Sequence, residues 1–234
     1  MPPKKIRPDT GDGRKGVGPL IPPLVETQRP LRQQVFELVR AAGLIPRVQV
    51  AKDLGVSPAS ITTITSELIE AGLIEEVAAP RDGEAGRGRP AVALGVRAGA
   101  HRVAGMKLSD REHTAVVVDF AGNLIADDVI PRRPVPMSVT EILDAIETLL
   151  DRVCAKAKLT RADLSAVGIG VPGFVDSAEG MVLWSSVLAD RSVALAAAAG
   201  ARLGLPVTID NDANLVALAE LWFGAGRSLS DFAV

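Results

Sequence analysis

The sequence predicts two folded regions of different class: a small, mainly helical domain first, and a larger mixed α/β domain after it. Residues 29–70 carry apolar side chains at helical spacing. After residue 98, apolar strand-like runs alternate with amphipathic helical segments. Charge is divided in the same way: residues 1–97 hold 14 Lys and Arg against 11 Asp and Glu, net +3, whereas residues 98–234 hold 12 against 17, net -5. A basic first part favours a polyanionic partner for that region.

Composition limits the class of protein. A chain of 234 residues, 47% of them hydrophobic, can bury a sizeable core. Its one cysteine, Cys154, excludes an internal disulfide, and the Pro- and Lys-rich start is unlike a secretory signal. No apolar run reaches the roughly 18 residues needed to cross a bilayer. We therefore expect a cytoplasmic protein with no membrane partner, and a disordered tail at residues 1–28, which are rich in Pro, Gly and charge.

Three helices are predicted next. The first covers residues 29–42 and ends at Gly43; the second is short and runs from Pro46 to Gly55. Ser57 caps the third helix, with Pro58 at its first position. Its predicted buried stripe consists of Ile61, Ile64, Leu68 and Ile69.

The side of the third helix that remains exposed is small and polar. Two helices joined by a short Gly turn are the elements of a helix-turn-helix, whose second helix enters the DNA major groove. Small side chains allow close approach to base edges and thymine methyl groups. The predicted contacts to an operator in double-stranded DNA are Ser57, Ala59, Ser60, Thr62 and Thr63. The alternative is that the three helices only pack together.

A strand, a Gly-rich charged loop and a second strand follow the helices. The loop contains "GRGRP", which places Arg87 and Arg89 on a flexible backbone suited to the minor groove or to phosphates. Helices followed by such a hairpin make residues 29–97 a predicted winged helix-turn-helix. The alternatives are a solvated hairpin, or a linker that begins at Arg89.

The region after residue 98 begins with three predicted consecutive strands, at 101–109, 113–120 and 123–130, which form a meander. A long helix, 138–158, and a strand, 166–171, come next. A helix at 192–203, a strand at 206–210 and a helix at 213–223 complete the prediction.

Three motifs in this region resemble the ROK family, which contains sugar kinases and sugar-responsive repressors of bacteria. They are "GIGVPGFVD" (168–176), "VTIDNDANLVALAE" (207–220) and "FGAGR" (223–227). The resemblance implies an actin-like, RNase-H-like lobe for residues 98–234, with a second lobe of about 150 residues missing. It also implies sugar-binding roles for Pro172, Gly173, Asn211 and Asp212, the last matching the general base of the family's kinases. Alternatively, Asn211 or Asp212 only caps the following helix.

The chain departs from the kinase pattern at the turn between the first two strands of this region. Where ROK kinases carry Asp-x-Gly-Gly-Thr around the phosphates, this chain has Lys107, Leu108, Ser109, Asp110 and Arg111. The family's zinc motif is also absent. We therefore expect no enzyme activity, no cofactor and no metal.

The leading hypothesis is a DNA-binding transcriptional regulator, most simply a repressor of carbohydrate-metabolism genes. A sugar effector would control it, and the full-length protein would be a homodimer. The alternatives are a ROK-type sugar kinase, disfavoured by the altered turn, and a non-functional truncation.

Overall fold

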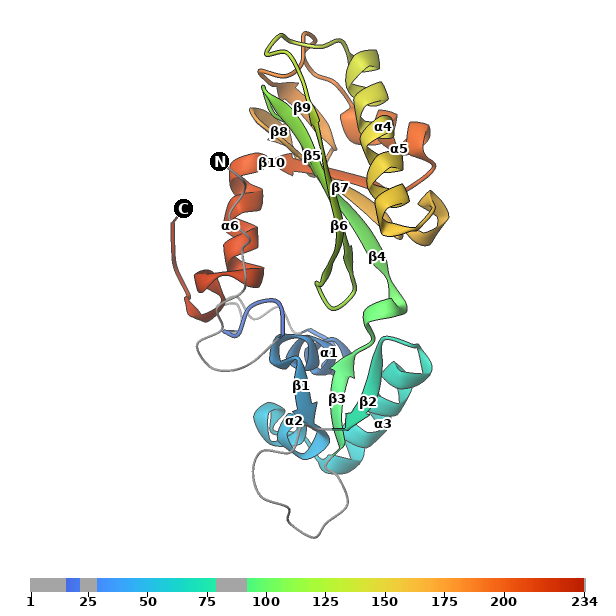
Figure 1. Ribbon diagram of the computed structural model, residues 1–234. Helices are drawn as coiled ribbons and strands as arrows, with labels where there is room; N and C mark the ends of the chain where they lie inside the picture. Colours follow the sequence, from blue (N-terminus) through green and yellow to red (C-terminus); the bar gives the residue numbers. More distant parts are fainter. Residues whose placement is uncertain (1–15, 22–28, 79–91, 234) are drawn as a thin grey trace. The chain divides into compact units, whose positions relative to one another are not determined.

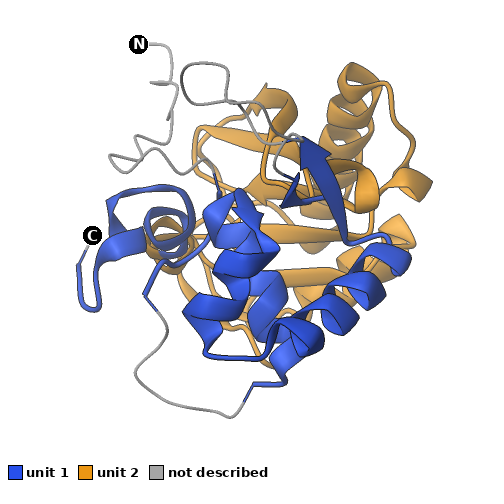
Figure 2. Cartoon of the chain, turned by 90° about the horizontal axis from the view of Figure 1, so that it is seen from below, with its two compact units in different colours: residues 1–97, 218–233 blue, residues 98–217, 234 orange. Residues whose placement is uncertain are grey.

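The computed structural model describes residues 16–21, 29–78 and 92–233. The chain divides into two compact units (Figures 1 and 2). The first contains Met1–Arg97 and also Leu218–Ala233; the second contains Ala98–Ala217. The sequence assigned residues 98–234 to one domain, whereas residues 218–233 pack with the first unit.

The first unit contains three helices and a small sheet. The helices are α1 (Leu31–Ala42), α2 (Arg47–Leu54) and α3 (Pro58–Glu70). The strands β1 (Leu44–Pro46), β2 (Ile74–Ala78) and β3 (Val92–Val96) pair antiparallel in the order β1-β3-β2. Val35, Val39, Ile61, Leu68 and Leu94 lie in their common core. Strand β1 was not predicted, because three residues ending in a proline carry no periodic signal.

Glycine ends the first two helices as expected. Gly43 and Gly55 follow α1 and α2 with φ angles of 77° and 64°, in the range that side-chain-bearing residues avoid. Each donates its amide back to a carbonyl in the last turn of its helix. The chain can therefore turn at once from α1 into β1, and from α2 toward α3.

The second unit is built on a five-stranded mixed sheet. Its strands are β4 (Arg102–Lys107), β5 (Glu112–Asp119), β6 (Leu124–Pro131), β7 (Ala166–Val171) and β10 (Val207–Asn211). Their order is β10-β7-β4-β5-β6, with β4, β5 and β6 antiparallel and β7 and β10 parallel to β4. The predicted meander is confirmed, and the sheet has the mixed topology expected of an actin-like lobe.

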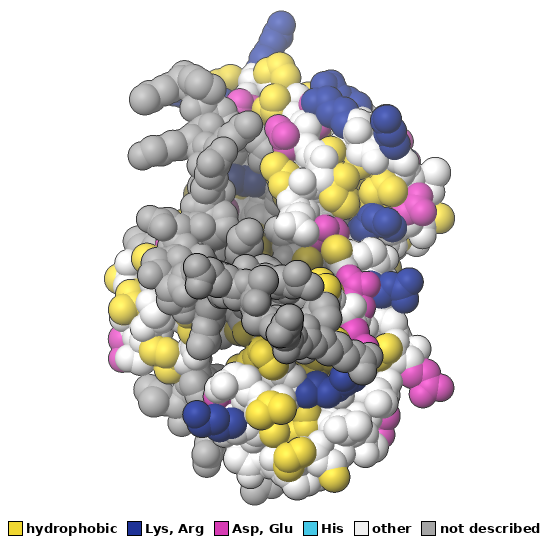
Figure 3. Space-filling model, turned by 60° about the horizontal axis from the view of Figure 1, so that its bottom comes forward, with side chains coloured by type: hydrophobic (Ala, Val, Ile, Leu, Met, Phe, Trp, Pro, Cys, Tyr) yellow, Lys and Arg dark blue, Asp and Glu magenta, His cyan; other side chains and the backbone are white. Residues whose placement is uncertain are grey.

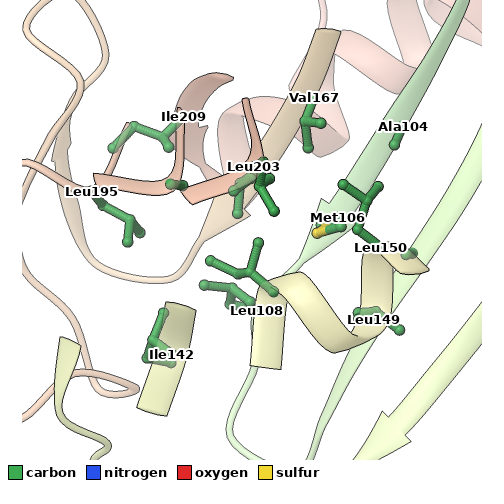
Figure 4. Packing of buried hydrophobic residues seen from close by; sticks show 14 of the residues in the cluster. Ala104, Met106, Leu108, Ile142, Leu149, Leu150, Val167, Leu195, Leu203 and Ile209 are labelled. Atoms are coloured by element: carbon green, nitrogen blue, oxygen red, sulfur yellow. The ribbon is translucent and has the colours of Figure 1, made fainter. Parts of the chain in front are cut away.

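Two helices, α4 (Val139–Ala157) and α5 (Leu195–Leu203), cover one face of this sheet (Figure 1). Strand residues such as Ala104, Met106 and Val167 belong to the same buried cluster as Ile142 and Leu149 of α4 (Figure 4). Ser138 and Glu141 form a capping box at the start of α4. Burial of one large aliphatic side chain of this kind contributes about 1.5–3 kcal/mol. The strands are thereby fixed, and with them the loops at their ends.

A short hairpin follows β7. Its strands, β8 (Phe174–Asp176) and β9 (Met181–Trp184), pair antiparallel and were not predicted. Helix α6 (Asp212–Phe223) directly follows β10; its first residues belong to the second unit and its last ones to the first. Within the described part of the chain, every helix is too short or too polar to traverse a lipid bilayer.

Candidate functional site

The parallel strands β7 and β10 bring the two predicted sugar segments together. Val171 and Asn211, the last residues of these strands, lie opposite each other in the register. The Pro172-Gly173 turn follows the first strand, and Asp212 follows the second. Ligands of open α/β sheets bind at the carboxyl ends of parallel strands, so this edge of the sheet is the natural position for a small-molecule site.

Gly173 shows why the turn needs a glycine. Its φ is +120°, and a Cβ built there would lie 2.1 Å from the carbonyl oxygen of Trp184 in β9. The turn therefore packs directly on the hairpin backbone, which no larger residue would permit.

Asn211 holds this edge of the sheet together. Its Nδ2 donates to the Gly173 carbonyl oxygen at 2.6 Å. Its Oδ1 accepts from the amides of Ala213 at 2.8 Å and Asn214 at 3.4 Å, in the first turn of α6. Asn211 therefore caps the helix, as the structural alternative expected, and also joins the two segments. A capped Asn211 keeps little free hydrogen-bonding capacity on Oδ1 for a ligand.

Asp210 is a polar residue of this edge that the sequence reasoning did not assign. Its Oδ1 accepts from Ser177 Oγ at 2.8 Å, Asn214 Nδ2 at 3.0 Å and the Asn211 amide at 2.7 Å. Burial opposes ionisation, but these hydrogen bonds outweigh it and lower the pKa of the Asp210 carboxyl. Its place within the "DNDAN" run was the available signal, and only the fold reveals its partner in the hairpin loop.

Asp212 faces a lysine. Its Oδ2 lies 3.9 Å from Nζ of Lys107, the residue in place of the kinases' phosphate-turn aspartate. Lys107 pairs with Gly170 in the register between β4 and β7, which brings it to the same edge of the sheet. A cation therefore lies beside the carboxylate that matches the kinases' general base.

Side chains also occupy the turn between β4 and β5, which matches the kinases' phosphate turn. The Ser109 amide donates to Nδ1 of His113 at 3.3 Å, and Ser186 Oγ donates to Asp110 Oδ1 at 3.0 Å. His113 is 1% exposed, and burial, assisted by the charge of Arg132, lowers its pKa to about 4. Kinases of this type need free backbone amides here for phosphate oxygens. In this chain the Ser109 amide is already bonded to a neutral imidazole.

The second candidate surface lies on α3. All five predicted DNA-contacting residues of this helix are exposed: Ser57, Ala59, Ser60, Thr62 and Thr63. Ser57 caps the helix by accepting from the Ser60 amide at 3.2 Å, with Pro58 in the first turn. The exposed row is therefore held on a regular, capped helix.

The hydroxyl groups of this row have a defined orientation. Thr62 Oγ1 donates to the Pro58 carbonyl at 2.8 Å, and Thr63 Oγ1 donates to that of Ala59 at 3.3 Å. A hydroxyl that has used its proton in this way presents lone pairs outward. The row is thus suited to accept hydrogen bonds, for which the amino groups of adenine and cytosine are the donors in the major groove.

The buried stripe of α3 differs from its prediction. Ile64 and Ile69 are only half-buried, while Thr65 is fully buried with Ile61 and Leu68. Thr65 is tolerated there because its hydroxyl donates to the Ile61 carbonyl at 2.8 Å and accepts from Arg47 Nε at 3.0 Å. Arg47 also pairs with Glu76 in β2. This polar chain connects α2, α3 and the sheet.

The predicted wing residues Arg87 and Arg89 lie outside the described residues, as do residues 1–15 and 22–28 of the predicted tail. Residues 16–21 of that tail are described, and they are held by backbone hydrogen bonds to distant parts of the chain, which the expectation of disorder did not include. On the described atoms of one face, Lys and Arg side chains are scattered among acidic and uncharged ones (Figure 3). No group of three or more His, Cys, Asp or Glu able to hold a metal ion occurs within residues 16–21, 29–78 and 92–233.

Comparisons with known proteins agree on one family. Residues 103–234, more than half of the chain, match the ROK family. The xylose repressor of Caldicellulosiruptor bescii is 29% identical over 188 residues, which make up 80% of this chain and 46% of that protein. The DNA-binding transcriptional dual regulator NagC of Escherichia coli K12 is 28% identical over 200 residues, 84% of this chain and 47% of NagC.

A solved structure gives the same result. A ROK family transcriptional regulator, a homolog of the E. coli MLC protein, aligns with a TM-score of 0.61 and 30% identity, over 81% of this chain and 47% of that chain. This chain spans about half the length of the curated relatives that it matches. With the fold, the motifs and these relatives in agreement, the chain belongs to the ROK family.

Proposed function

We propose that the protein is a DNA-binding transcriptional regulator, and that residues 29–97 form a winged helix-turn-helix that reads an operator. The observation that carries this is the exposed face of α3, a capped helix with Ser57, Ala59, Ser60, Thr62 and Thr63 on one side and a packed core on the other. The names of its relatives, a xylose repressor and NagC, support repression as the outcome. Arg87 and Arg89 of the predicted wing would add minor-groove or phosphate contacts.

We further propose that a sugar binds at the edge formed by Pro172, Gly173, Asn211 and Asp212, and alters the affinity for DNA. The polar groups at the ends of β7 and β10 support this site. An effector of this kind must bind the DNA-competent and DNA-incompetent forms with unequal affinity. A regulator of chromosomal genes would act in the cytoplasm, and a homodimer would match the two-fold symmetry of an inverted repeat.

Phosphoryl transfer is not part of the proposal. Lys107 lies beside Asp212, and the Ser109 amide is bonded to His113. A reaction that depends almost wholly on positioning and charge stabilisation would lack the phosphate cradle that it needs.

A binding titration tests the proposal. DNA selected from a random pool by the 234-residue protein is compared with unselected DNA by fluorescence anisotropy, at two salt concentrations. We expect the selected DNA to bind at least about 1,000-fold more tightly, in the range of specific operators. Equal binding of both DNAs by the wild-type protein would overturn the assignment.

Variants locate the contact. Thr62→Ala with Thr63→Ala is expected to reduce the preference by about 10-fold or more, since each good base contact discriminates by about 1–3 kcal/mol. Thr140→Ala changes another exposed threonine, near the start of α4 in the second unit; it is the matched control and should leave the preference unchanged.

A further inference from the structure

The C-terminal end of α1 is held by an arginine that lies 186 positions further along the chain. Arg227, in the short helix η3 (Ala225–Ser228), is 3% exposed. Its Nη2 donates to the Ala41 carbonyl in the last turn of α1, and its Nε donates to the Gly18 carbonyl, both at 2.8 Å. The last carbonyls of a helix have no partners within the helix, so a guanidinium is a favourable partner for them.

The segment at residues 16–20 lies between these two elements. The Val17 amide donates to the Arg40 carbonyl of α1 at 3.1 Å. The Gly18 amide donates to the Trp222 carbonyl, and the Leu20 amide donates to the Arg227 carbonyl, both at 2.8 Å. The guanidinium of Arg40 lies 4.1 Å from the centre of the Trp222 ring. We call this set of contacts the arginine latch: Arg227, Arg40, Trp222 and residues 16–20.

Glycine is required in the latch. A Cβ on Gly16 would lie 2.3 Å from the carbonyl oxygens of Arg40 and Ala41, and Gly18 has a φ of +95°. The segment can follow the end of α1 this closely only without side chains at these two positions. The close contact between this segment and α1 therefore depends on glycine at both positions, whereas a chance surface contact would tolerate other residues there.

Helix α6 connects the latch to the candidate sugar site. Its first residue is Asp212, its amides at 213 and 214 are capped by Asn211, and Trp222 lies in its last turn. Twelve residues at a rise of 1.5 Å make a helix about 18 Å long. One end of a single helix thus carries sugar-site residues, and at its other end the Trp222 carbonyl accepts the Gly18 amide while the Trp222 ring lies beside Arg40 of α1.

We propose that Arg227 is the positioning residue through which the sugar site controls DNA binding. This rests on the proposed function. A sugar that bonds to Asn211 or Asp212 competes with the cap and ion-pair contacts at the start of α6, and a shift of this helix reaches α1 through the latch. Two directional hydrogen bonds from one rigid guanidinium suit such a role, because they form together or break together.

The test uses the 234-residue protein and its selected DNA. Affinity is measured without sugar and with D-xylose, N-acetyl-D-glucosamine or D-glucose at saturation, for the wild type, Arg227→Gln and Arg227→Lys. The wild type should change its affinity by about 5-fold or more with one sugar, the usual range of allosteric coupling. Both variants should change by less than about 2-fold, while calorimetry shows the same sugar affinity within about 3-fold. Lysine retains the charge but cannot make both hydrogen bonds.

Two controls separate positioning from general stability. Arg202→Gln removes another arginine with two partners, Asp144 and Glu147 of α4, and should preserve the full sugar response. Trp222→Leu removes the ring beside Arg40 but leaves the bonds of Arg227, and should reduce the response only in part. Amide hydrogen exchange tests the latch directly. The amides of Val17, Gly18 and Leu20 should exchange slowly in the wild type and rapidly in Arg227→Gln.

The outcomes are distinguishable. A wild-type protein that responds to none of the sugars overturns the proposed sugar control, and this inference with it. A wild type and an Arg227→Gln variant with the same response overturn only the inference. Arg227→Gln could also lose sugar binding, DNA binding and its cooperative unfolding transition together. In that case, a folded Trp222→Leu variant that keeps the full sugar response overturns only the inference.

Discussion

Replacement of Asn211 tests how the end of β10 is built. Asn211→Ala removes the acceptor for the Ala213 and Asn214 amides and the donor to the Gly173 carbonyl. Loss of an N-cap costs about 1 kcal/mol, and loss of a half-buried hydrogen bond about 1 kcal/mol more. We therefore expect a decrease of about 2 kcal/mol in the free energy of unfolding. With a urea m-value of about 2 kcal/mol/M for a unit of this size, the midpoint should fall by about 1 M.

Two neighbouring substitutions divide this effect. Asn211→Asp keeps a good cap but loses the donor to Gly173, so about half of the loss or more should remain. Asp212→Asn removes only a partly exposed ion pair of 3.9 Å and a favourable charge at the helix start, and should lower the midpoint by less than about 0.5 M. Far-UV circular dichroism in urea at pH 7 measures all three. An Asn211→Ala midpoint within about 0.2 M of the wild type, or an equal loss for Asp212→Asn, would refute this account of the edge.

Three further predictions concern the second unit. Burial lowers the pKa of His113 from 6.5 to about 4, so the folded protein favours the neutral imidazole. The free energy of unfolding should therefore keep its full value above pH 6.5 and fall by about 3 kcal/mol as the pH approaches 4. Urea midpoints at pH 7 and 4.5 measure this, and a His113→Leu variant with the same pH dependence would contradict it. Asp128 is 5% exposed, and the hydrogen bonds that it accepts from Lys156 and then Arg152 outweigh its burial and lower its pKa to about 2. Asp128→Asn should therefore cost about 2 kcal/mol at pH 7 in thermal unfolding, and a change below about 0.5 kcal/mol would contradict this. MgATP should show no calorimetric binding up to about 1 mM and no phosphorylation of the three sugars, and turnover of any of them would restore the kinase alternative.

Much of the fold could be predicted because local signals are strong there. The helix over residues 138–158 has a capping serine, a regular apolar stripe and a basic end, and it is found at Val139–Ala157. The strand at 166–171 is found with the same bounds. The exposed row of α3 also follows from a period of 3.6 residues and its capped start. In each case neighbours in sequence decide the outcome.

Other features depend on residues that only folding brings together. The short strands β1, β8 and β9 exist because partners pair with them, and their three or four residues are too few to show a period. Thr65, which the predicted buried stripe did not include, is buried with its hydroxyl bonded to the distant Arg47. The site could be predicted as a set of residue types, but the partners of Asn211 and Asp212 could not.

The sequence by itself thus determined the positions of the longer helices and strands, most of their apolar faces, and the alteration of the phosphate turn, because these are properties of consecutive residues. Only the tertiary structure decided that Lys107 lies against Asp212, that Asn211 ties a turn to a helix, and that Arg227 reaches Gly18 across 209 positions. Contacts of this kind depend on the distances between side chains after packing, and the order of residues along a chain does not specify those distances.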